Sequence, residues 1–281
     1  MRYTAKAYAK TNLFLDVVSK RDDGYHDIDS VMQSLSVYDL VSLELTDSGI
    51  SVECDNEELD GTENIAYRAC EIFLDFAELD CGVKVYIKKN IPIAAGLGGG
   101  SADAAAVLVL LNIASGKNYP VSELVPIAAS LGADVPFFLI GGTVKANGIG
   151  EILTKLPDTR LSFVLLKQHS KQSTGAMYRL LDSIEERPHG DLNGFIESIS
   201  CGSSVIAAGI FNSFETCWDM DMLSAPLKAF SPLKIFLSGS GPTVCALFRD
   251  DFEAKACAKA LCDEGVKAFA VSSVPFGIEI V

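Results

Sequence analysis

Positive charge is scarce in this sequence. Of its 281 residues, 23 are Lys or Arg and 37 are Asp or Glu, which gives a formal net charge of −14. Nucleic acids and anionic membrane surfaces are bound through basic patches, so the composition argues against both as partners. An anionic ligand must then be held locally, by backbone amides and a few lysines.

The sequence also lacks the spacings that mark a metal site or a membrane span. No two of the eight cysteines have C-x-x-C spacing and the three histidines are scattered, so we expect no zinc site. The longest purely apolar run, Ala104 to Leu111, is far shorter than the roughly 20 residues that cross a bilayer. The first residues contain no apolar core of a signal peptide. We therefore expect a cytoplasmic protein with buried free thiols.

Hydrophobic periodicity predicts strands mixed with helices. In the first half, strands are expected at 12–18, 41–45, 50–54, 83–87 and 143–146, and helices at 64–79, 101–115 and 122–131, the first capped by Asn64. In the second half, strands are expected at 161–166, 233–237, 243–248 and 267–273, and helices at about 173–182, 191–199, 204–219 and 252–264. The irregular order predicts an α+β fold. A composition change at Leu156-Pro157-Asp158 predicts two domains, 1–157 and 158–281.

A glycine-rich loop leads directly into one of the predicted helices. Four glycines fall within five residues, Gly96 to Gly100, and Ser101 opens a run of alanines, valine and leucines. Glycine allows close backbone approach, and a helix start offers free N–H groups, so this stretch favours phosphate binding over a flexible connection. Ser101, expected at the N-cap, would donate to a phosphate oxygen or bind Mg²⁺. The loop lacks the spacing of a dinucleotide fingerprint and the G-K-[ST] ending of a P-loop.

Four further features are ambiguous when each is taken alone. Lys10 and Asn12 share one face of a strand, but a single lysine is often simply solvated. Asp134 stands in an apolar stretch and is either a general base or a helix N-cap. The turn 238–242 is either an ordinary hairpin turn or a second glycine-rich wall of a cleft. The pair at 25–26 either stacks on a base or packs on the surface.

Taken together, the motifs resemble the GHMP small-molecule kinase superfamily. They are A-K-x-N-L near the N-terminus, P-x-x-x-G-L-G-G-G-S-A-D-A-A, then G-A-D-V-P-F-F, and S-G-S-G-P-T near the end. The resemblance implies a fold of two α+β halves, the first like ribosomal protein S5 domain 2 and the second ferredoxin-like, with the active site between them. Within the superfamily, G-Y-H and the triple glycine resemble members that phosphorylate the 2-hydroxyl of a cytidyl diphosphate sugar alcohol in the methylerythritol phosphate route to isoprenoids.

The resemblance also implies roles for individual residues. Asp134 would be the general base and Lys10 its catalytic partner, with ATP as co-substrate and Mg²⁺ as its metal. The residues implied to bind ATP are Asn64, Lys89, Pro92, Gly96, Leu97, Gly98, Gly99, Gly100 and Ser101. Those implied to bind the small-molecule substrate are Asn12, Tyr25, His26, Thr174, Tyr178, Gly239 and Gly241, with Tyr25 and Tyr178 sandwiching the cytosine and His26 reading its edge.

Two alternatives remain open from the sequence. One is another small-alcohol kinase of the superfamily, of homoserine or mevalonate type, which would share the loop and the glycine-rich turn. The other is a catalytically silent nucleotide or sugar sensor on the same fold, which would bind ATP without releasing ADP. The presence of both Lys10 and Asp134 favours an enzyme. The sequence does not indicate an oligomeric state.

Overall fold

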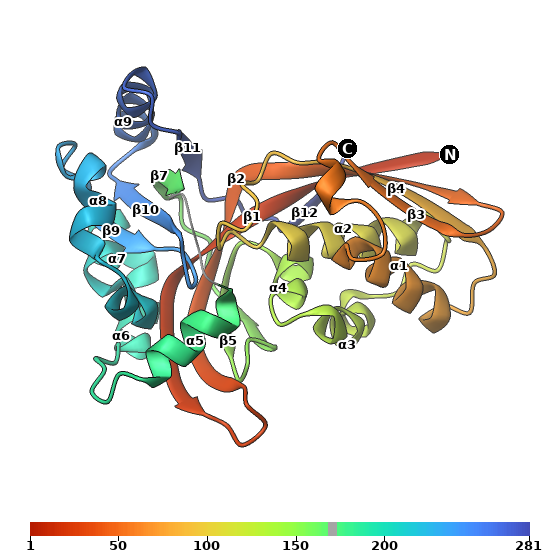
Figure 1. Ribbon diagram of the computed structural model, residues 1–281, viewed down its shortest axis with the longest axis horizontal. Helices are drawn as coiled ribbons and strands as arrows, with labels where there is room; N and C mark the ends of the chain where they lie inside the picture. Colours follow the sequence, from red (N-terminus) through yellow and green to blue (C-terminus); the bar gives the residue numbers. More distant parts are fainter. Residues whose placement is uncertain (168–172) are drawn as a thin grey trace.

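Two halves, each containing helices and strands, lie side by side in the computed structural model, which describes residues 1–167 and 173–281 (Figure 1). The first half is built on an eight-stranded sheet and the second on a four-stranded antiparallel sheet. This arrangement confirms the predicted α+β fold class.

The large sheet is dominated by two long antiparallel strands, β1 (Arg2–Lys20) and β2 (His26–Thr46). Register shifts along the pair bend it, and its far end runs down beside the second half (Figure 1). The sheet order is β12-β1-β2-β4-β3, with β5 paired to β2 and β6, and β8 paired to β1. The remaining strands are β3 (Ile50–Cys54), β4 (Gly82–Lys88), β5 (Thr143–Asn147), β6 (Ile152–Lys155), β8 (Phe211–Asn212) and β12 (Ile278–Ile280).

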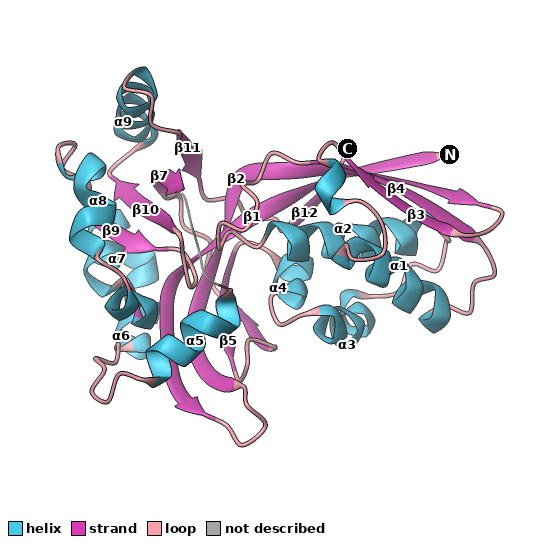
Figure 2. Ribbon diagram, in the orientation of Figure 1, coloured by secondary structure: helices cyan, strands magenta, loops and turns pink. Residues whose placement is uncertain are grey.

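Helices cover one face of the large sheet (Figure 2). They are α1 (Ile65–Phe76), α2 (Gly99–Ala114), α3 (Val121–Leu131) and α4 (Val135–Ile140), with a 3-10 turn η1 at Glu57–Leu59. The Asn64 side chain accepts a 2.9 Å hydrogen bond from the Ala66 amide, which confirms the predicted cap of α1. Helix α2 is buried along almost its whole length between α1, α4 and the sheet, so its run of alanines and leucines needs no polar face.

The small sheet has the order β11-β7-β10-β9. Its strands are β7 (Ser162–Lys167), β9 (Lys234–Leu237), β10 (Thr243–Phe248) and β11 (Ala268–Ser272). The helices of this half are α5 (Thr174–Asp182), α6 (Leu192–Ser198), α7 (Ser203–Gly209), α8 (Met220–Lys228) and α9 (Asp251–Asp263), with 3-10 turns η2 (Ile199–Cys201) and η3 (Ser213–Cys217).

The prediction of one helix over 204–219 is wrong. Helix α7 ends at Gly209, and the chain then pairs with β1 as β8 before the turn η3. The cause is Asn212, whose side-chain amide donates to the carbonyls of Leu237 and Gly239 at 2.8 Å while its oxygen accepts from the Phe214 amide. These three bonds hold the chain extended, where a helix would need its own backbone pairing.

Strands from the second part of the chain complete the first sheet. Both β8 and β12 follow residue 157 in sequence, yet both pair with β1. The boundary between 157 and 158 stays a prediction.

All eight cysteines are free, as expected, but Cys201 and Cys262 are exposed where buried thiols were predicted. Within the described residues no helix is long and apolar enough to cross a membrane.

Candidate active site

Two cavities meet at the glycine-rich loop. The first, about 590 Å³, lies against the β1–β2 hairpin and α5, and we call it the hairpin cavity. The second, about 500 Å³, lies at the start of α1, and we call it the α1 cavity. Gly96, Gly98 and Ser101 line both, so a ligand in either cavity touches the same loop.

The loop is held so closely that side chains would not fit. Gly98 has φ +74°, and a Cβ there would lie 2.7 Å from the Phe138 ring and 2.9 Å from Lys10 Cγ. A Cβ on Gly96 would lie 2.6 Å from the Ser238 carbonyl and 2.8 Å from that of Gly241, so the two glycine-rich segments touch. Gly98 is the N-cap of α2, which corrects the prediction that Ser101 takes that position. Ser101 lies in the first turn, where the free N–H groups form an anion site.

Lys10 and Asp134 face each other beside this loop. Lys10 Nζ lies 3.3 Å from Asp134 Oδ2 and donates to Asn12 Oδ1 at 2.8 Å, as expected for two residues on one face of β1. Asp134 stands at the N-cap position of α4, yet its side chain makes no capping bond. The carboxylate is instead turned to the lysine and lines the hairpin cavity, the arrangement that a general base requires.

A chain of hydrogen bonds fixes the Asn12 amide. Its Nδ2 donates to Ser30 Oγ at 2.9 Å, and the Ser30 hydroxyl donates to the Phe14 carbonyl at 2.8 Å. The amide oxygen must therefore face Lys10. Ser30 is a positioning residue that the sequence analysis missed, because nothing local in the sequence links it to a residue on the neighbouring strand.

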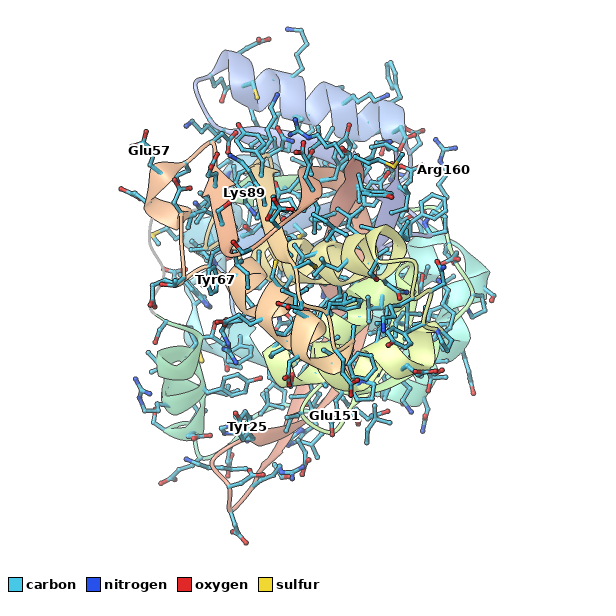
Figure 3. The ribbon with its side chains drawn as sticks, turned by 90° about the vertical axis from the view of Figure 1, so that its right-hand side faces the viewer. Tyr25, Glu57, Tyr67, Lys89, Glu151 and Arg160 are labelled. Atoms are coloured by element: carbon cyan, nitrogen blue, oxygen red, sulfur yellow. The ribbon has the colours of Figure 1, made fainter. Side chains whose placement is uncertain are left out.

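Helix α5 and the hairpin close the other end of the hairpin cavity. The Tyr178 ring stacks on His26, with centroids 4.6 Å apart, and its burial raises the pKa of Tyr178 to about 12. Thr174 lies one turn before it, and all three residues line the cavity. Tyr25 also lines it but is 60% exposed, on the hairpin at the bottom of Figure 3. Since one face of Tyr178 lies on His26, the sandwich by Tyr25 and Tyr178 stays a prediction.

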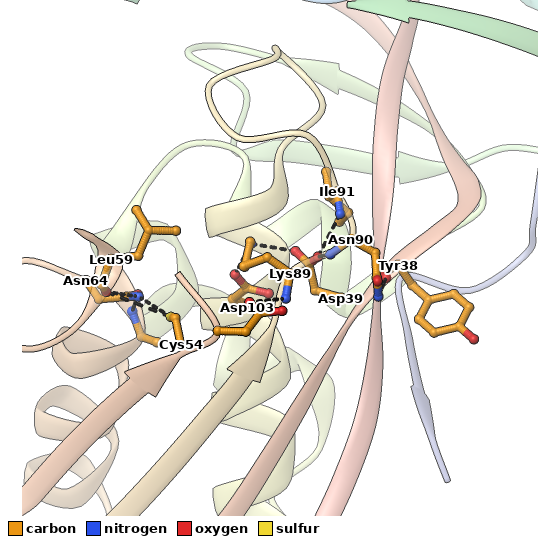
Figure 4. Close-up of polar contacts among 11 residues, drawn as sticks. Tyr38, Asp39, Cys54, Leu59, Asn64, Lys89, Asn90, Ile91 and Asp103 are labelled. Atoms are coloured by element: carbon orange, nitrogen blue, oxygen red, sulfur yellow. Dashed lines mark hydrogen bonds and ion pairs between the residues drawn. The ribbon is translucent and has the colours of Figure 1, made fainter. Parts of the chain in front are cut away.

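In the α1 cavity, Lys89 lies between two carboxylates (Figure 4). Its Nζ lies 2.5 Å from both Asp39 Oδ2 and Asp103 Oδ2. Asp39 also accepts from the backbone amides of Asn90 and Ile91, so it fixes the segment that enters the glycine-rich loop. Burial and the nearby Asp39 charge raise the pKa of Asp103 to about 8, although Lys89 opposes this. The charges of Asp103 and Asp39 raise the pKa of Lys89 despite its burial.

Most of the other predicted residues line one of the two cavities, and one lies behind the cavity surface. Asn64, Pro92, Leu97, Gly99 and Gly100 line the α1 cavity, although the Asn64 amide also donates to the Leu59 carbonyl (Figure 4). Gly239 lines the hairpin cavity. Gly241 does not line either cavity. It lies behind the turn, where a Cβ would be 3.0 Å from the Trp218 ring.

Asp39, Asp103 and Asp182 were missed by the sequence analysis. Asp103 carried a signal that was overlooked, a lone carboxylate among alanines, which is the same kind of signal that singled out Asp134. Within the described residues, no group of three or more His, Cys, Asp or Glu is arranged to hold a metal ion.

Family models match both parts of the chain. The model described as GHMP kinases N terminal domain matches residues 64–142, and that described as GHMP kinases C terminal matches residues 227–267. Among curated relatives, 4-diphosphocytidyl-2-C-methyl-D-erythritol kinase of Clostridium botulinum (strain Eklund 17B / Type B) is 36% identical, covering 96% of this chain and 99% of its own. The protein of the same name in Acetivibrio thermocellus is 39% identical, covering 93% and 94%.

Comparison with solved structures finds the same kind of protein. A crystal structure of 4-(cytidine 5'-diphospho)-2C-methyl-D-erythritol kinase superposes on this chain with a TM-score of 0.80 at 29% identity, covering 96% of this chain and 98% of the other. The homoserine kinase of Cytophaga hutchinsonii superposes with a TM-score of 0.75 at 17% identity, covering 100% and 97%, which shows a shared fold.

Proposed function

This chain belongs to the 4-diphosphocytidyl-2-C-methyl-D-erythritol kinase family of GHMP kinases, and on that basis we propose that it transfers the γ-phosphoryl group of ATP to the 2-hydroxyl of 4-diphosphocytidyl-2-C-methyl-D-erythritol. The observation that carries this proposal is the Lys10–Asp134 pair, 3.3 Å apart, beside the loop shared by the two cavities. The reaction is a step of isoprenoid synthesis, which we place in the cytoplasm.

The two cavities suit the two substrates. The α1 cavity, with free N–H groups at the start of α2, would take ATP and lay its phosphates on the glycine-rich loop. The hairpin cavity, with the aromatic and imidazole rings of Tyr25, His26 and Tyr178, would take the cytidyl substrate. The terminal phosphate and the acceptor hydroxyl would then meet at Gly96–Ser101.

The chain's own groups provide proton transfer and electrostatic stabilisation. As the hydroxyl oxygen bonds to the γ-phosphorus and the bond to the ADP oxygen breaks, the hydroxyl proton passes to the Asp134 carboxylate. Lys10, held by Asn12, lies 3.3 Å from the Asp134 carboxylate and would offset charge on the transferring group. Phosphoryl transfer requires mainly such positioning and charge stabilisation.

Mg²⁺ would be carried mostly by the ATP phosphates and water, which is its usual mode in kinase sites. The Ser101 hydroxyl, in the first turn of α2 and lining both cavities, is the side chain we place next to it. When bound, the ion would neutralise charge on the phosphates.

Release of ADP tests the proposal. Purified protein with Mg-ATP is assayed with the cytidyl substrate, homoserine and mevalonate, and Asp134→Asn is assayed in parallel. We expect turnover with the cytidyl substrate alone, with kcat lowered by about 10²–10⁴-fold in the variant. Turnover with another alcohol would keep the kinase chemistry but discard the cytidyl assignment. ATP binding without turnover on any alcohol would favour a sensor.

A further inference from the structure

Asp182, the last residue of α5, joins that helix to both strands of the hairpin. Its Oδ1 lies 2.7 Å from His26 Nε2, and its Oδ2 accepts from Lys20 Nζ at 2.8 Å. The Tyr178 ring also stacks on one face of the His26 imidazole, with the two centroids 4.6 Å apart. The imidazole is therefore fixed in both position and tilt, and it lines the hairpin cavity.

The partners of Asp182 decide where the imidazole carries its proton. Burial opposes ionisation of Asp182, but the hydrogen bonds from Lys20 and His26 outweigh it and lower the pKa of Asp182. An ionised carboxylate only accepts hydrogen bonds, so Nε2 must be the donor. The other ring nitrogen, Nδ1, has no hydrogen-bond partner among residues 1–167 and 173–281. In a neutral imidazole that nitrogen is an acceptor.

We propose that Asp182 is a positioning residue that fixes the Nε2–H tautomer of His26, so that Nδ1 accepts from the 4-amino group of cytosine and the cavity rejects uracil. This inference rests on the proposed function, because it names how the same cavity chooses its substrate. It goes beyond the expectation that His26 reads the base, since it assigns the choice to a residue of α5 that acts through His26.

The chemistry of the two pyrimidines explains the choice. Cytosine and uracil differ at position 4, where the first has an amino donor and the second a carbonyl acceptor. An acceptor held rigidly at that position bonds the amino group but faces the carbonyl without a shared proton. A buried polar group left unpaired in this way is the main source of selectivity between such analogues.

A residue whose only role is to hold α5 against the hairpin would give a different result from the one we expect of Asp182. Asp182 also bonds Lys20, so it ties α5 to the hairpin through two contacts. If its only role were to hold α5 in place, removing Lys20 would also weaken the selectivity for cytosine over uracil. If Asp182 instead acts through His26, loss of the Asp182 carboxylate should weaken that selectivity, and loss of the Lys20 amine should not.

The experiment measures kcat/KM with the cytidyl substrate and with its uridyl analogue. We expect Asp182→Asn, which offers His26 either a donor or an acceptor, to lower the cytidyl-to-uridyl ratio on the order of tenfold. KM for ATP should not change. Lys20→Met should keep the ratio. The matched control is Asp221→Asn, which removes a carboxylate bonded to Lys228 at 2.6 Å on α8. In a His26→Asn background, Asp182→Asn should lower the ratio no further.

Two readouts do not require turnover. With ¹⁵N-labelled histidine, the three imidazoles of the chain are few enough to assign by His26→Asn, and His26 should show a protonated Nε2 that Asp182→Asn loses. Calorimetry should show tighter binding of CDP than UDP, with the preference reduced in Asp182→Asn. An unchanged ratio and tautomer in Asp182→Asn, or an equal loss in Lys20→Met, would overturn the inference. Absent turnover in the wild type with an intact CDP preference would instead refute the proposed kinase activity alone.

Discussion

Lys10 lines the hairpin cavity and Lys89 lines the α1 cavity, and each lies close to a carboxylate, but their surroundings differ. Lys10 meets a single carboxylate at 3.3 Å, on Asp134, which is 42% exposed, and a neutral amide. Lys89 lies between two carboxylates at 2.5 Å, on Asp39 and Asp103, which are 0% and 3% exposed. The same two residue types therefore make an open pair beside the loop in one case and a closed cluster in the other.

The difference shows what makes such a pair available for chemistry. Asp134 keeps a solvent-facing side that a substrate can reach. Asp39, in contrast, accepts hydrogen bonds from Lys89 and from the amides of Asn90 and Ile91. Taking ions out of water costs several kcal/mol each unless the partners are close and well paired. The Lys89 cluster thus holds the entrance of the loop, whereas the Lys10–Asp134 pair keeps the open side that our proposed reaction needs.

The largest effect on activity should come from replacing the carboxylate of the Lys10–Asp134 pair. Asp134→Asn keeps the shape of the side chain but cannot accept the hydroxyl proton. We expect kcat to fall by about 10²–10⁴-fold, while thermal unfolding shifts little because Asp134 makes no capping bond and is partly hydrated. Steady-state kinetics and calorimetry test this. A variant with wild-type kcat would remove Asp134 from the reaction.

The second effect separates the two lysines by stability. Lys89→Met leaves the buried Asp39 carboxylate without its cation, so the free energy of unfolding should drop by about 3–5 kcal/mol. Lys10→Met leaves only the half-exposed Asp134 and should cost about 1 kcal/mol or less, while abolishing turnover. Urea unfolding of both variants gives the comparison. Equal losses of stability would show that the two sites do not differ as described.

The third effect is a pH dependence carried by the closed cluster. The pKa of Asp103 is raised in the folded state from its ordinary value of about 3.9 to about 8, so between these pH values the folded chain binds one more proton than the unfolded chain. Its contribution to stability is then fully present below about pH 4 and is lost as pH rises through 8, by at most about 1.4 kcal/mol per pH unit. Relative to Asp103→Asn, the wild type should lose stability over this range. If the free energy of unfolding of the two proteins changed with pH in the same way, Asp103 would not be the source of this pH dependence.

The smallest effect concerns the neutral partner of Lys10. Ser30→Ala removes the hydroxyl that fixes the Asn12 amide, at a cost of about 1 kcal/mol, which corresponds to roughly fivefold in kcat. Ser224→Ala, a buried serine on α8 whose hydroxyl lies 3.5 Å from the Asp221 carbonyl, is the control. If both variants behave alike, Ser30 has no role in positioning.

The sequence allowed the Lys10–Asp134 pair to be singled out, but not the closed cluster around Lys89. Lys10 and Asn12 share a face because strands repeat every two residues, and Asp134 stood out as a charge in an apolar stretch. Asp39 reaches Lys89 only because strand β2 pairs with β4 in one register, which local periodicity does not specify. For the same reason, Asp182 and His26, 156 residues apart, could not be linked.

The pairing of β12 with β1 bears on the order in which the chain is made. Ala5 and Ala7 lie opposite Ile280 and Ile278, so they leave the ribosome long before the residues with which they pair. Until residues 278–280 emerge, that edge of β1 has no partner, and an unpaired edge strand invites association with other chains. The edge of β1 around Ala5–Ala7 is therefore where a chaperone at the ribosomal exit would protect the nascent chain.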